Sequence, residues 1–373
     1  MTDLAPNAGS TVGRSLWADA WSRLKANRAA YWSAIYIVIM AVACIAGPWF
    51  TPHDFTTIYQ DYTRVPPSLE AYPRPEMIDQ AVKDAVKRSR VELASWEDRG
   101  DKVSIVVTSA KPIDPRMTRY IDRSSVFENA EVTETSPDGL KLTISADVER
   151  EHFYFGTDTI GRDLLTRTLI AGRVSLAIGL LAGLVAVAIG VLYGATAGFV
   201  GGKTDEVMMR IVDILYSLPF IFFVIMLVVF FGRNFVLMFL AVGAVLWLDM
   251  ARIVRGQALS IRRQEYVQAA EALGVSRGGI LLRHVVPNLL GPVVIYMTLL
   301  VPQVIILESF LSYLGLGVQE PMSSWGVLIS QGAKNIPGAN WLLFFPSFFL
   351  TTTLFALNFI GDGLRDALDP KDR

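Results

Sequence analysis

Long uncharged, apolar stretches alternate with polar segments along the 373 residues of the chain. A helix that crosses the hydrocarbon core of a bilayer needs about 20 predominantly apolar residues. Such runs predict an all-α membrane protein with six transmembrane helices, at residues 29–50, 174–200, 211–232, 234–254, 285–311 and 338–361. The fourth reaches a spanning length only if its helix continues past Asp249, which places that carboxylate near a membrane interface.

Basic residues near the ends of these spans predict how the chain is oriented. Lys and Arg are enriched in the cytoplasmic loops of membrane proteins. They gather before the first span, between the fourth and fifth, and in the tail, whereas the opposite short loops hold only Arg233 and Lys334. We therefore expect the segment 1–28, the loop 255–284 and both termini to be cytoplasmic. The basic residues on this side are Arg14, Arg23, Lys25, Arg28, Arg252, Arg255, Arg262, Arg263, Arg277, Arg283, Arg365, Lys371 and Arg373.

Residues 51–155 form a polar insert between the first two predicted spans, far longer than an ordinary connection. Apolar residues recur at helical spacing at Ile78, Ala81, Val82, Ala85 and Val86. Residues 102–108 and 140–146 instead alternate like strands, with turn residues before the second. We expect a small extracytoplasmic α+β domain here, followed by the remaining helices in residues 156–373.

The second predicted span carries a regular series of glycines. At about 100° per residue they fall within one sector of the helix roughly 100° wide. Such a stripe lets helix backbones approach closely in lipid, so we favour helix packing over a substrate groove as its role. The glycines are Gly179, Gly183, Gly190, Gly194 and Gly198.

Composition supports the membrane assignment and removes several other classes. Apolar residues make up 52% of the chain and charged residues only 18%, a balance too apolar for an ordinary soluble domain. The net charge of −1 gives no electrostatic argument for a nucleic-acid partner. Cys44 is the single cysteine, so an internal disulfide is excluded and the usual zinc and redox spacings are missing.

One segment imitates a catalytic motif. Residues 197–204 read AGFVGGKT and resemble a phosphate-binding loop, except that Ala197 stands at the first glycine position. A working loop of that kind joins a strand to a helix in an α/β domain, whereas here a membrane helix precedes it. We therefore interpret it as a glycine-rich cytoplasmic turn with Lys203 as a positive-inside residue. Neither H-E-x-x-H nor G-x-S-x-G occurs, so we predict no catalytic residue, bound cofactor or metal in this chain.

Isolated ionisable residues lead to the same view. The histidines His53, His152 and His284 lie far apart along the sequence. Carboxylates within membrane segments are costly and often mark ion paths. Asp213 and Glu308, however, fall near opposite ends of their spans, so we favour structural pairing over a proton relay for both.

The loop 255–284 is amphipathic and interrupted at defined points. Tyr266, Ala269, Ala270 and Leu273 recur at helical spacing, and Gly274 is suited to a left-handed helix end. Ser276 can cap a second helix. The pattern predicts two short helices around a glycine turn. On composition alone a helix lying on the membrane surface is favoured over one that docks onto another protein.

The same loop resembles the EAA loop of bacterial ABC importer permeases. Ala269, Ala270, Gly274 and Pro287 match that pattern, whereas Gln268 replaces its glutamate, and His284 and Val286 replace its isoleucine and leucine. These forms are similar to the peptide and nickel transporter branch, as are Tyr266, Leu273, Arg283 and Asn288.

Three further segments strengthen this resemblance. The residues Gly156, Thr157, Asp158, Gly161, Arg162 and Asp163 resemble a G-T-D-x-x-G-R-D segment of the same branch. Two others resemble its C-type permease subunit, particularly in oligopeptide importers. One is residues 310–317 (FLSYLGLG) with Gln319, Glu320, Pro321, Ser324, Trp325 and Gly326, and the other is residues 358–373. The insert is similar to the external scoop domain of oligopeptide permeases.

The resemblance implies a type I ABC importer permease fold in the bacterial inner membrane. It implies a homologous permease as partner, two ATPase subunits that use ATP and Mg²⁺, a periplasmic peptide-binding protein and a surrounding lipid bilayer. The ATPase-coupling residues it implies are Tyr266, Gln268, Ala269, Ala270, Glu271, Gly274, Arg283 and Pro287.

Alternatives to oligopeptide import stay open at this point. Dipeptides or nickel are substrates of the same branch. An ion-coupled secondary transporter would also have six spans, but it needs no such loop, and a membrane enzyme would need a catalytic constellation. Hydroxyl residues suited to a hydrated path are Ser309, Ser312 and Thr351–Thr353, whose facing the sequence does not give.

Overall fold

The computed structural model describes residues 16–232 and 234–368. It divides into two compact units. The helical unit comprises Met1–Ile45, Ala171–Val327 and Ser347–Arg373, and the mixed unit comprises Ala46–Ile170 and Leu328–Pro346. Arg14, Arg233, Lys371 and Arg373, four of the basic residues used to predict orientation, lie outside the described residues.

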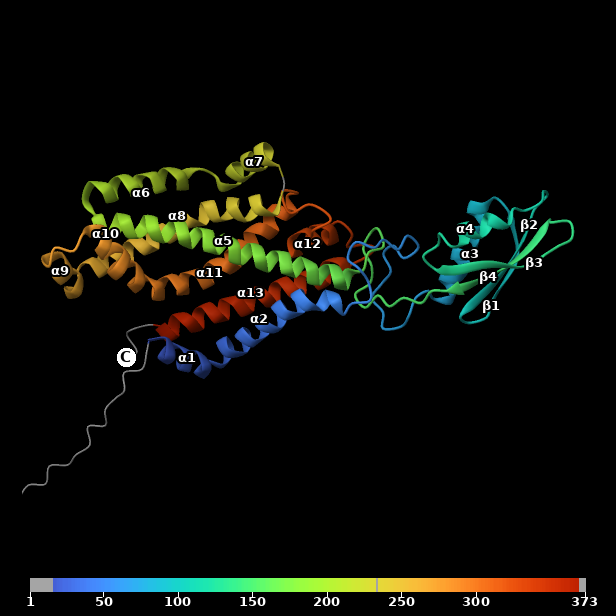
Figure 1. Ribbon diagram of the computed structural model, residues 1–373, viewed down its shortest axis with the longest axis horizontal. Helices are drawn as coiled ribbons and strands as arrows, with labels where there is room; N and C mark the ends of the chain where they lie inside the picture. The colour runs from blue at the N-terminus through green and yellow to red at the C-terminus, as the bar shows by residue number, and fades with distance from the viewer. Residues whose placement is uncertain (1–15, 233, 369–373) are drawn as a thin grey trace, which may run out of the picture. The chain divides into compact units, whose positions relative to one another are not determined.

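Most of the described chain outside the insert is helical (Figure 1). They are α1 (Leu16–Ala26), α2 (Arg28–Ala46), η1 (Gly47–Trp49), α5 (Leu164–Val200), α6 (Gly202–Ser217), α7 (Phe220–Phe231), α8 (Phe235–Arg262), α9 (Glu265–Ala272), α10 (Arg277–Ile280), the π-helical turn η3 (Leu281–Val285), α11 (Val286–Tyr313), α12 (Trp325–Ala333) and α13 (Trp341–Leu368).

Five helical segments in the described part of the chain are long and apolar enough to cross a membrane, and a sixth span results if the bent pair α6 and α7 counts as one. The predicted single helix at 211–232 is therefore wrong in detail. Its two halves meet at 84°. The break falls at Leu218, whose extended backbone (φ −77°, ψ 132°) suits a residue that precedes a proline, here Pro219.

The other helices run past the boundaries that uncharged runs predict. Helix α5 begins at Leu164 instead of residue 174, and α8 continues to Arg262 instead of ending at 254. Arginines inside these helices have partners. Arg173 donates to the carbonyls of Cys44 (3.3 Å) and Ile45 (3.0 Å) at the end of α2, where a helix leaves carbonyl groups unsatisfied. At about 1.5 Å per residue α5 is roughly 55 Å long, more than a hydrocarbon core of about 30 Å requires.

The glycine stripe faces two neighbours of α5. A Cβ atom on Gly179 would lie 2.9 Å from Ile305 of α11, and Gly183 also faces α11. Gly190, Gly194 and Gly198 instead lie against the backbone or first side-chain atoms of α8. Helix α13 joins the same bundle, because Gly361 contacts Leu299 of α11. The stripe therefore occupies places where helices approach closely.

The insert is an α+β domain, as predicted. It contains α3 (Pro75–Ser89), β1 (Glu92–Asp98), β2 (Lys102–Thr108), η2 (Pro115–Met117), α4 (Thr118–Ile121), β3 (Phe127–Thr135) and β4 (Lys141–Val148). The strands form an antiparallel sheet in the order β1-β2-β4-β3. All five residues of the predicted helical pattern are buried in α3. The edge strands β1 and β3 escaped prediction, because neither shows a regular alternation of buried and exposed residues.

Candidate functional site: an exposed two-helix loop

The predicted pair of short helices around Gly274 is present. Helix α9 ends in a left-handed residue, Gly274, at φ 77°. The Gly274 N–H donates to the Glu271 carbonyl (3.0 Å) and the Val275 N–H to the Ala270 carbonyl (3.1 Å), the bond pair of a Schellman helix end. Ser276 then caps α10 by accepting the Gly279 N–H. The sequence therefore forms this turn through local capping, and glycine is needed at 274 for its positive φ.

Burial divides helix α9 into two faces. Val267 and Ala270 are buried at 0% and 7% exposure, whereas Leu273 is 84% exposed and Tyr266 43%. With about 100° per residue, the outward face of Tyr266, Ala269 and Leu273 points roughly 100° away from the buried pair. The apolar residues grouped from the sequence therefore do not form one surface. Ala270 packs into the protein's own core, while Ala269 and Leu273 face outward.

The outward face belongs to a larger exposed surface. Gln268, Glu271, Arg283 and Pro287 are exposed, and Gln268 donates its side-chain amide to the Arg263 carbonyl (3.3 Å). A Cβ atom on Gly274 would meet no atom within 4 Å. We call the exposed residues Tyr266, Gln268, Ala269, Glu271, Leu273, Gly274, Arg283 and Pro287 the loop surface.

The loop surface is firmly attached to the bundle. Val267, Ala270, Ile280 and Val285 belong to the same buried cluster as residues of α8 and α11, among them Val254, Ala258 and Leu289. Close-packed side chains transmit displacement. A force applied to the loop surface therefore reaches both long helices.

Two ion pairs tie α6 to α8 beside this loop. Arg255 donates to both carboxylate oxygens of Asp205 (2.5 and 2.6 Å), and Arg252 donates to Asp213 (2.8 Å). Structural pairing of Asp213, favoured from the sequence, is confirmed. The Asp205 pair is not predicted from the sequence. The three-residue spacing of Arg252 and Arg255, which puts both on one helix face, is the sequence signal that points to paired carboxylates on a neighbouring helix.

Residues 197–204, which resemble a phosphate-binding loop in sequence, differ from such a loop in local structure. Helix α5 runs to Val200, Gly201 follows at φ 68°, and Lys203 lies in the first turn of α6. A helix thus precedes the segment where a phosphate-binding loop needs a strand.

Among the described residues, no three His, Cys, Asp or Glu side chains form a group that could hold a metal ion.

The G-T-D-x-x-G-R-D segment is buried in the mixed unit and acts as a structural junction. Thr157 accepts the Val65 N–H (2.8 Å) and donates to the Tyr62 carbonyl, while its own carbonyl accepts the Trp341 indole N–H (3.2 Å). Gly156 (φ 75°) and Gly161 (φ 88°) both have backbone so close that a Cβ atom would collide with it. Glycine is therefore required at both positions by conformation and by space.

Asp158 is the electrostatic centre of this segment. It accepts N–H groups of Ile160 and Arg162 (both 2.9 Å), the Arg162 Nε (2.8 Å) and a guanidinium nitrogen of Arg167. Burial on its own raises the pKa of Asp158, but the Arg167 guanidinium and the backbone N–H groups outweigh it and hold the pKa below its ordinary value. Arg167, nine positions after Asp158, was not predicted from the sequence.

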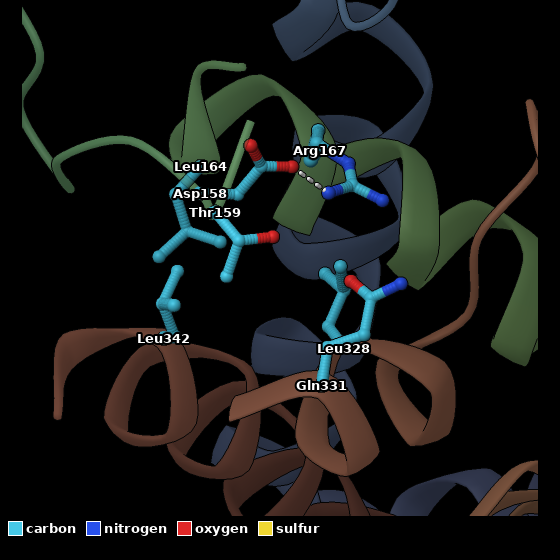
Figure 2. A pocket seen from close by; sticks show the side chains of 7 residues that line it. All are labelled: Asp158, Thr159, Leu164, Arg167, Leu328, Gln331 and Leu342. Carbon is cyan, nitrogen blue, oxygen red and sulfur yellow. Dashed lines mark hydrogen bonds and ion pairs between the residues drawn. The ribbon is translucent and has the colours of Figure 1, made fainter. Parts of the chain in front are cut away.

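A small pocket lies beside this pair (Figure 2). Asp158 and Arg167 lie on one side of it, facing side chains from α12 and α13. Its volume of about 10 Å³ has room for about one water molecule, far too little for a peptide. The lining residues are Asp158, Thr159, Leu164, Arg167, Leu328, Gln331 and Leu342.

Asp163 caps helix α5. Its carboxylate accepts the Thr166 N–H (2.8 Å) and hydroxyl (2.7 Å), a standard N-cap arrangement. Burial raises the pKa of Asp163, although the Thr166 bonds act in the opposite direction. Buried His53 lies beside it, with Nδ1 at 4.0 Å from Asp163 Oδ1 and Nε2 at 2.8 Å from Glu151. In the sequence His53 looks isolated, because its partners Glu151 and Asp163 are distant along the chain.

The hydroxyl residues proposed for a path do not share one surface. Thr351 is exposed, Thr352 bonds to the Tyr36 hydroxyl (2.6 Å), and Thr353 is buried. Ser312 is buried and donates to Glu308 (2.6 Å). The structure brings together Ser312 and Glu308, not the five predicted residues.

These features define a multi-pass membrane protein with an exposed loop surface and an α+β insert. Residues 190–373 match the family described as binding-protein-dependent transport system inner membrane component. Residues 15–67 match the N-terminal transmembrane domain of oligopeptide transport permease C.

Relatives of known name extend these matches over nearly the whole chain. The chain is 42% identical over 361 residues, 97% of its length, to the oligopeptide transport system permease protein OppC of Haemophilus influenzae, covering 90% of that protein. It is 60% identical over 236 residues, 63% of its length, to OppC of Escherichia coli strain K12, covering 78% of that protein. A structure of the MetNI methionine ABC transporter aligns with 52% of this chain and 93% of its own at 19% identity and a TM-score of 0.44, a similarity that identifies neither fold nor function by itself.

The chain belongs to the family of binding-protein-dependent inner-membrane permeases, in its oligopeptide permease branch. It is accordingly a multi-pass inner-membrane transport subunit and not an enzyme, as the resemblance implied. Family membership also supports the type I ABC importer permease fold.

Proposed function

We propose that this chain is the membrane subunit of an ATP-driven importer that moves oligopeptides from the periplasm into the cytoplasm. It forms half of the translocation path with a homologous permease. Two ATPase subunits use ATP and Mg²⁺, and a periplasmic binding protein delivers the peptide. The identity of 42% to an oligopeptide permease over 97% of the chain supports this substrate class.

The proposed orientation puts both termini and the loop surface in the cytoplasm and the insert in the periplasm. The distribution of arginines supports it, because Arg262, Arg263, Arg277 and Arg283 all lie at or near α9 and α10. The ATPase then meets the loop surface from the cytoplasmic side.

The observation that carries the proposal is an exposed loop surface on a buried anchor. Leu273 and Tyr266 offer apolar and aromatic contact area to a groove on the ATPase. Val267 and Ala270 transmit closure of the ATPases to α8 and α11. The Asp205–Arg255 bridge carries that motion to α6. The chain thus moves as packed helices, by hinge and shear.

The test replaces Leu273 by Asp and uses Leu69→Asp as the matched control. Leu273 is 84% exposed and Leu69, in the mixed unit, is 86% exposed, so neither change disturbs a core. We expect Leu273→Asp to weaken ATPase binding by about tenfold or more, as truncation of an interface anchor does. Co-purification of the ATPase subunits and ATP-dependent peptide uptake by proteoliposomes measure this. Normal uptake by the Leu273→Asp complex contradicts the coupling role.

Gly274 gives a second variant at the same surface. A bulky residue there occupies open space on the loop surface but also strains a backbone at φ 77°. We expect ATP hydrolysis to become uncoupled from uptake while the membrane subunit stays assembled. Leu273→Asp carries no such strain. Loss of uptake in both variants therefore supports a role of the loop surface in coupling, whereas loss in the Gly274 variant alone points to local misfolding.

Substrate and energy source are tested in the same proteoliposomes. Labelled oligopeptides, dipeptides and Ni²⁺ are offered with the cognate binding protein, with ATP inside or with an ion gradient alone. We expect ATP-dependent uptake of oligopeptides. Uptake by this chain alone on an ion gradient contradicts the importer and supports a secondary transporter.

A further inference from the structure

Glu308 lies at a junction of three segments of the helical unit and is fully buried at 0% exposure. Its Oε1 accepts the hydroxyls of Ser312 and Ser324 (both 2.6 Å), and Oε2 lies within hydrogen-bonding distance of the Ser175 hydroxyl oxygen, at 3.5 Å. Ser175 also accepts the Trp325 N–H (3.1 Å). One carboxyl group thereby links α5, α11 and the start of α12.

Close glycine contacts seal this junction. The chain turns back after α11 through Gly315, at φ 79°. A Cβ atom on Gly317 would collide with Ser312, and one on Gly326 would collide with Ser309. On α5, a Cβ atom on Gly172 would lie 2.5 Å from the ring of Trp325. The segment 314–326, which we call the return segment, therefore packs against α11 at Gly317 and Gly326 and against α5 at Trp325, while residues 319–322 between these contacts are exposed.

The hydroxyls around Glu308 carry no charge. The arginine nearest along α5, Arg173, is committed to the carbonyls of Cys44 and Ile45. Within the part of the chain that the structure describes, no ion pair involves Glu308, and its hydrogen-bond partners are serines. An ionised carboxylate buried without a cation is strongly disfavoured. A protonated one still accepts from Ser312 and Ser324 through Oε1 and can donate its O–H from Oε2 to the Ser175 hydroxyl oxygen.

We propose that Glu308 acts as a neutral carboxylic acid that latches the return segment onto α5 and α11. It is a positioning residue: it holds the connection between α11 and α12 in place and takes no part in an ion path. The role in uptake rests on the proposed function, but the latch itself does not.

The experiment compares Glu308→Gln with Glu308→Leu in the full complex. Gln keeps the size and the hydrogen bonding of the neutral acid and cannot titrate, whereas Leu keeps bulk and loses every hydrogen bond. We expect Glu308→Gln to import within about twofold of wild type, with the same pH profile from mildly acidic to mildly alkaline conditions. We expect Glu308→Leu to lose most uptake.

The rate of amide hydrogen exchange in the return segment tests the latch without a transport assay. We expect faster exchange confined to residues 314–326 in Glu308→Leu and wild-type exchange in Glu308→Gln. If Glu308→Leu does not assemble, Ser324→Ala removes one bond of the latch and must show the same local effect. If the wild-type complex takes up no peptide but the exchange results are as expected, the proposed importer function is overturned and the latch is not.

Two results overturn the latch. One is an assembled Glu308→Gln complex without uptake, because the charge itself is then required, as in a proton or ion path. The other is wild-type exchange in both Glu308→Leu and Ser324→Ala, because the hydrogen bonds then hold nothing in place.

Discussion

Close packing at the glycine stripe predicts a stability difference between two substitutions on the same helix. A Cβ atom on Gly190 would lie 2.6 Å from Met250 Cβ and 2.9 Å from the Trp247 carbonyl oxygen. Ordinary carbon contacts are about 3.5–4.0 Å, so α5 and α8 must separate by roughly 1 Å in Gly190→Ala. Such overpacking costs about 1–3 kcal/mol. Alanine regains about 1 kcal/mol of helix propensity, leaving a net loss of roughly 0–2 kcal/mol.

Gly183→Ala is the matched control. Its Cβ atom would lie 3.6 Å from Val301 and 3.9 Å from Met297, which are ordinary contacts. The propensity gain is common to both variants and cancels, so we expect Gly190→Ala to be less stable than Gly183→Ala by about 1–3 kcal/mol. Unfolding of the purified complex in detergent micelles titrated with SDS measures this. Equal stability refutes the packing argument, and normal stability with lost uptake in Gly190→Ala favours a substrate groove.

Two further predictions concern the junction at the start of α5. Asp158→Asn removes the buried negative charge that accepts a hydrogen bond from the Arg167 guanidinium, and we expect a loss of about 3–5 kcal/mol near neutral pH. Because the pKa of Asp158 is lowered in the fold, its stabilisation is present above about pH 3.9 and disappears as the pH falls through the lower folded pKa. The difference in the free energy of unfolding between variant and wild type therefore shrinks as the pH falls through this acidic range. A constant difference contradicts the charge argument. Asp163→Ala removes the N-cap bonds to Thr166 and is expected to cost roughly 0.5–2 kcal/mol, whereas Asp163→Asn retains them; identical unfolding curves for the two variants rule out the capping role.

Hydrophobic runs predicted which segments are helical but not where the helices end. Charge marked the boundary at Arg173 in the sequence, yet in the fold that guanidinium caps the carbonyls at the end of α2. Arg255 likewise lies inside α8, beyond the predicted end of that span at 254, and it is paired with Asp205 on α6. A window of apolar residues contains no information about such partners, which are distant along the chain. The break before Pro219, by contrast, was readable from the sequence through the constraint that proline places on Leu218.

The candidate site was predictable in its local geometry only. Gly274 and Ser276 fixed the two-helix turn because capping depends on neighbouring residues. The division of α9 into a buried and an exposed face depends instead on what α8 and α11 present to it. For the same reason, Ala269 and Ala270 are equivalent in the motif but not in the fold, where only Ala270 is buried.

Two glycine turns in this chain have the same backbone geometry but different surroundings. Gly274 and Gly315 end helices α9 and α11 with φ of 77° and 79°, and each turn is closed by the same pair of backbone bonds. At Gly274 the turn leaves the preceding Leu273 exposed, as part of the open loop surface. After Gly315 it folds back, so that Gly317 contacts Ser312 and encloses Glu308. The conformational need for glycine is the same in both turns, and the difference lies in the residues that follow. Residues 275–278 after Gly274 stay exposed beside the loop surface, whereas Gly317 and Val318 after Gly315 are buried within the bundle.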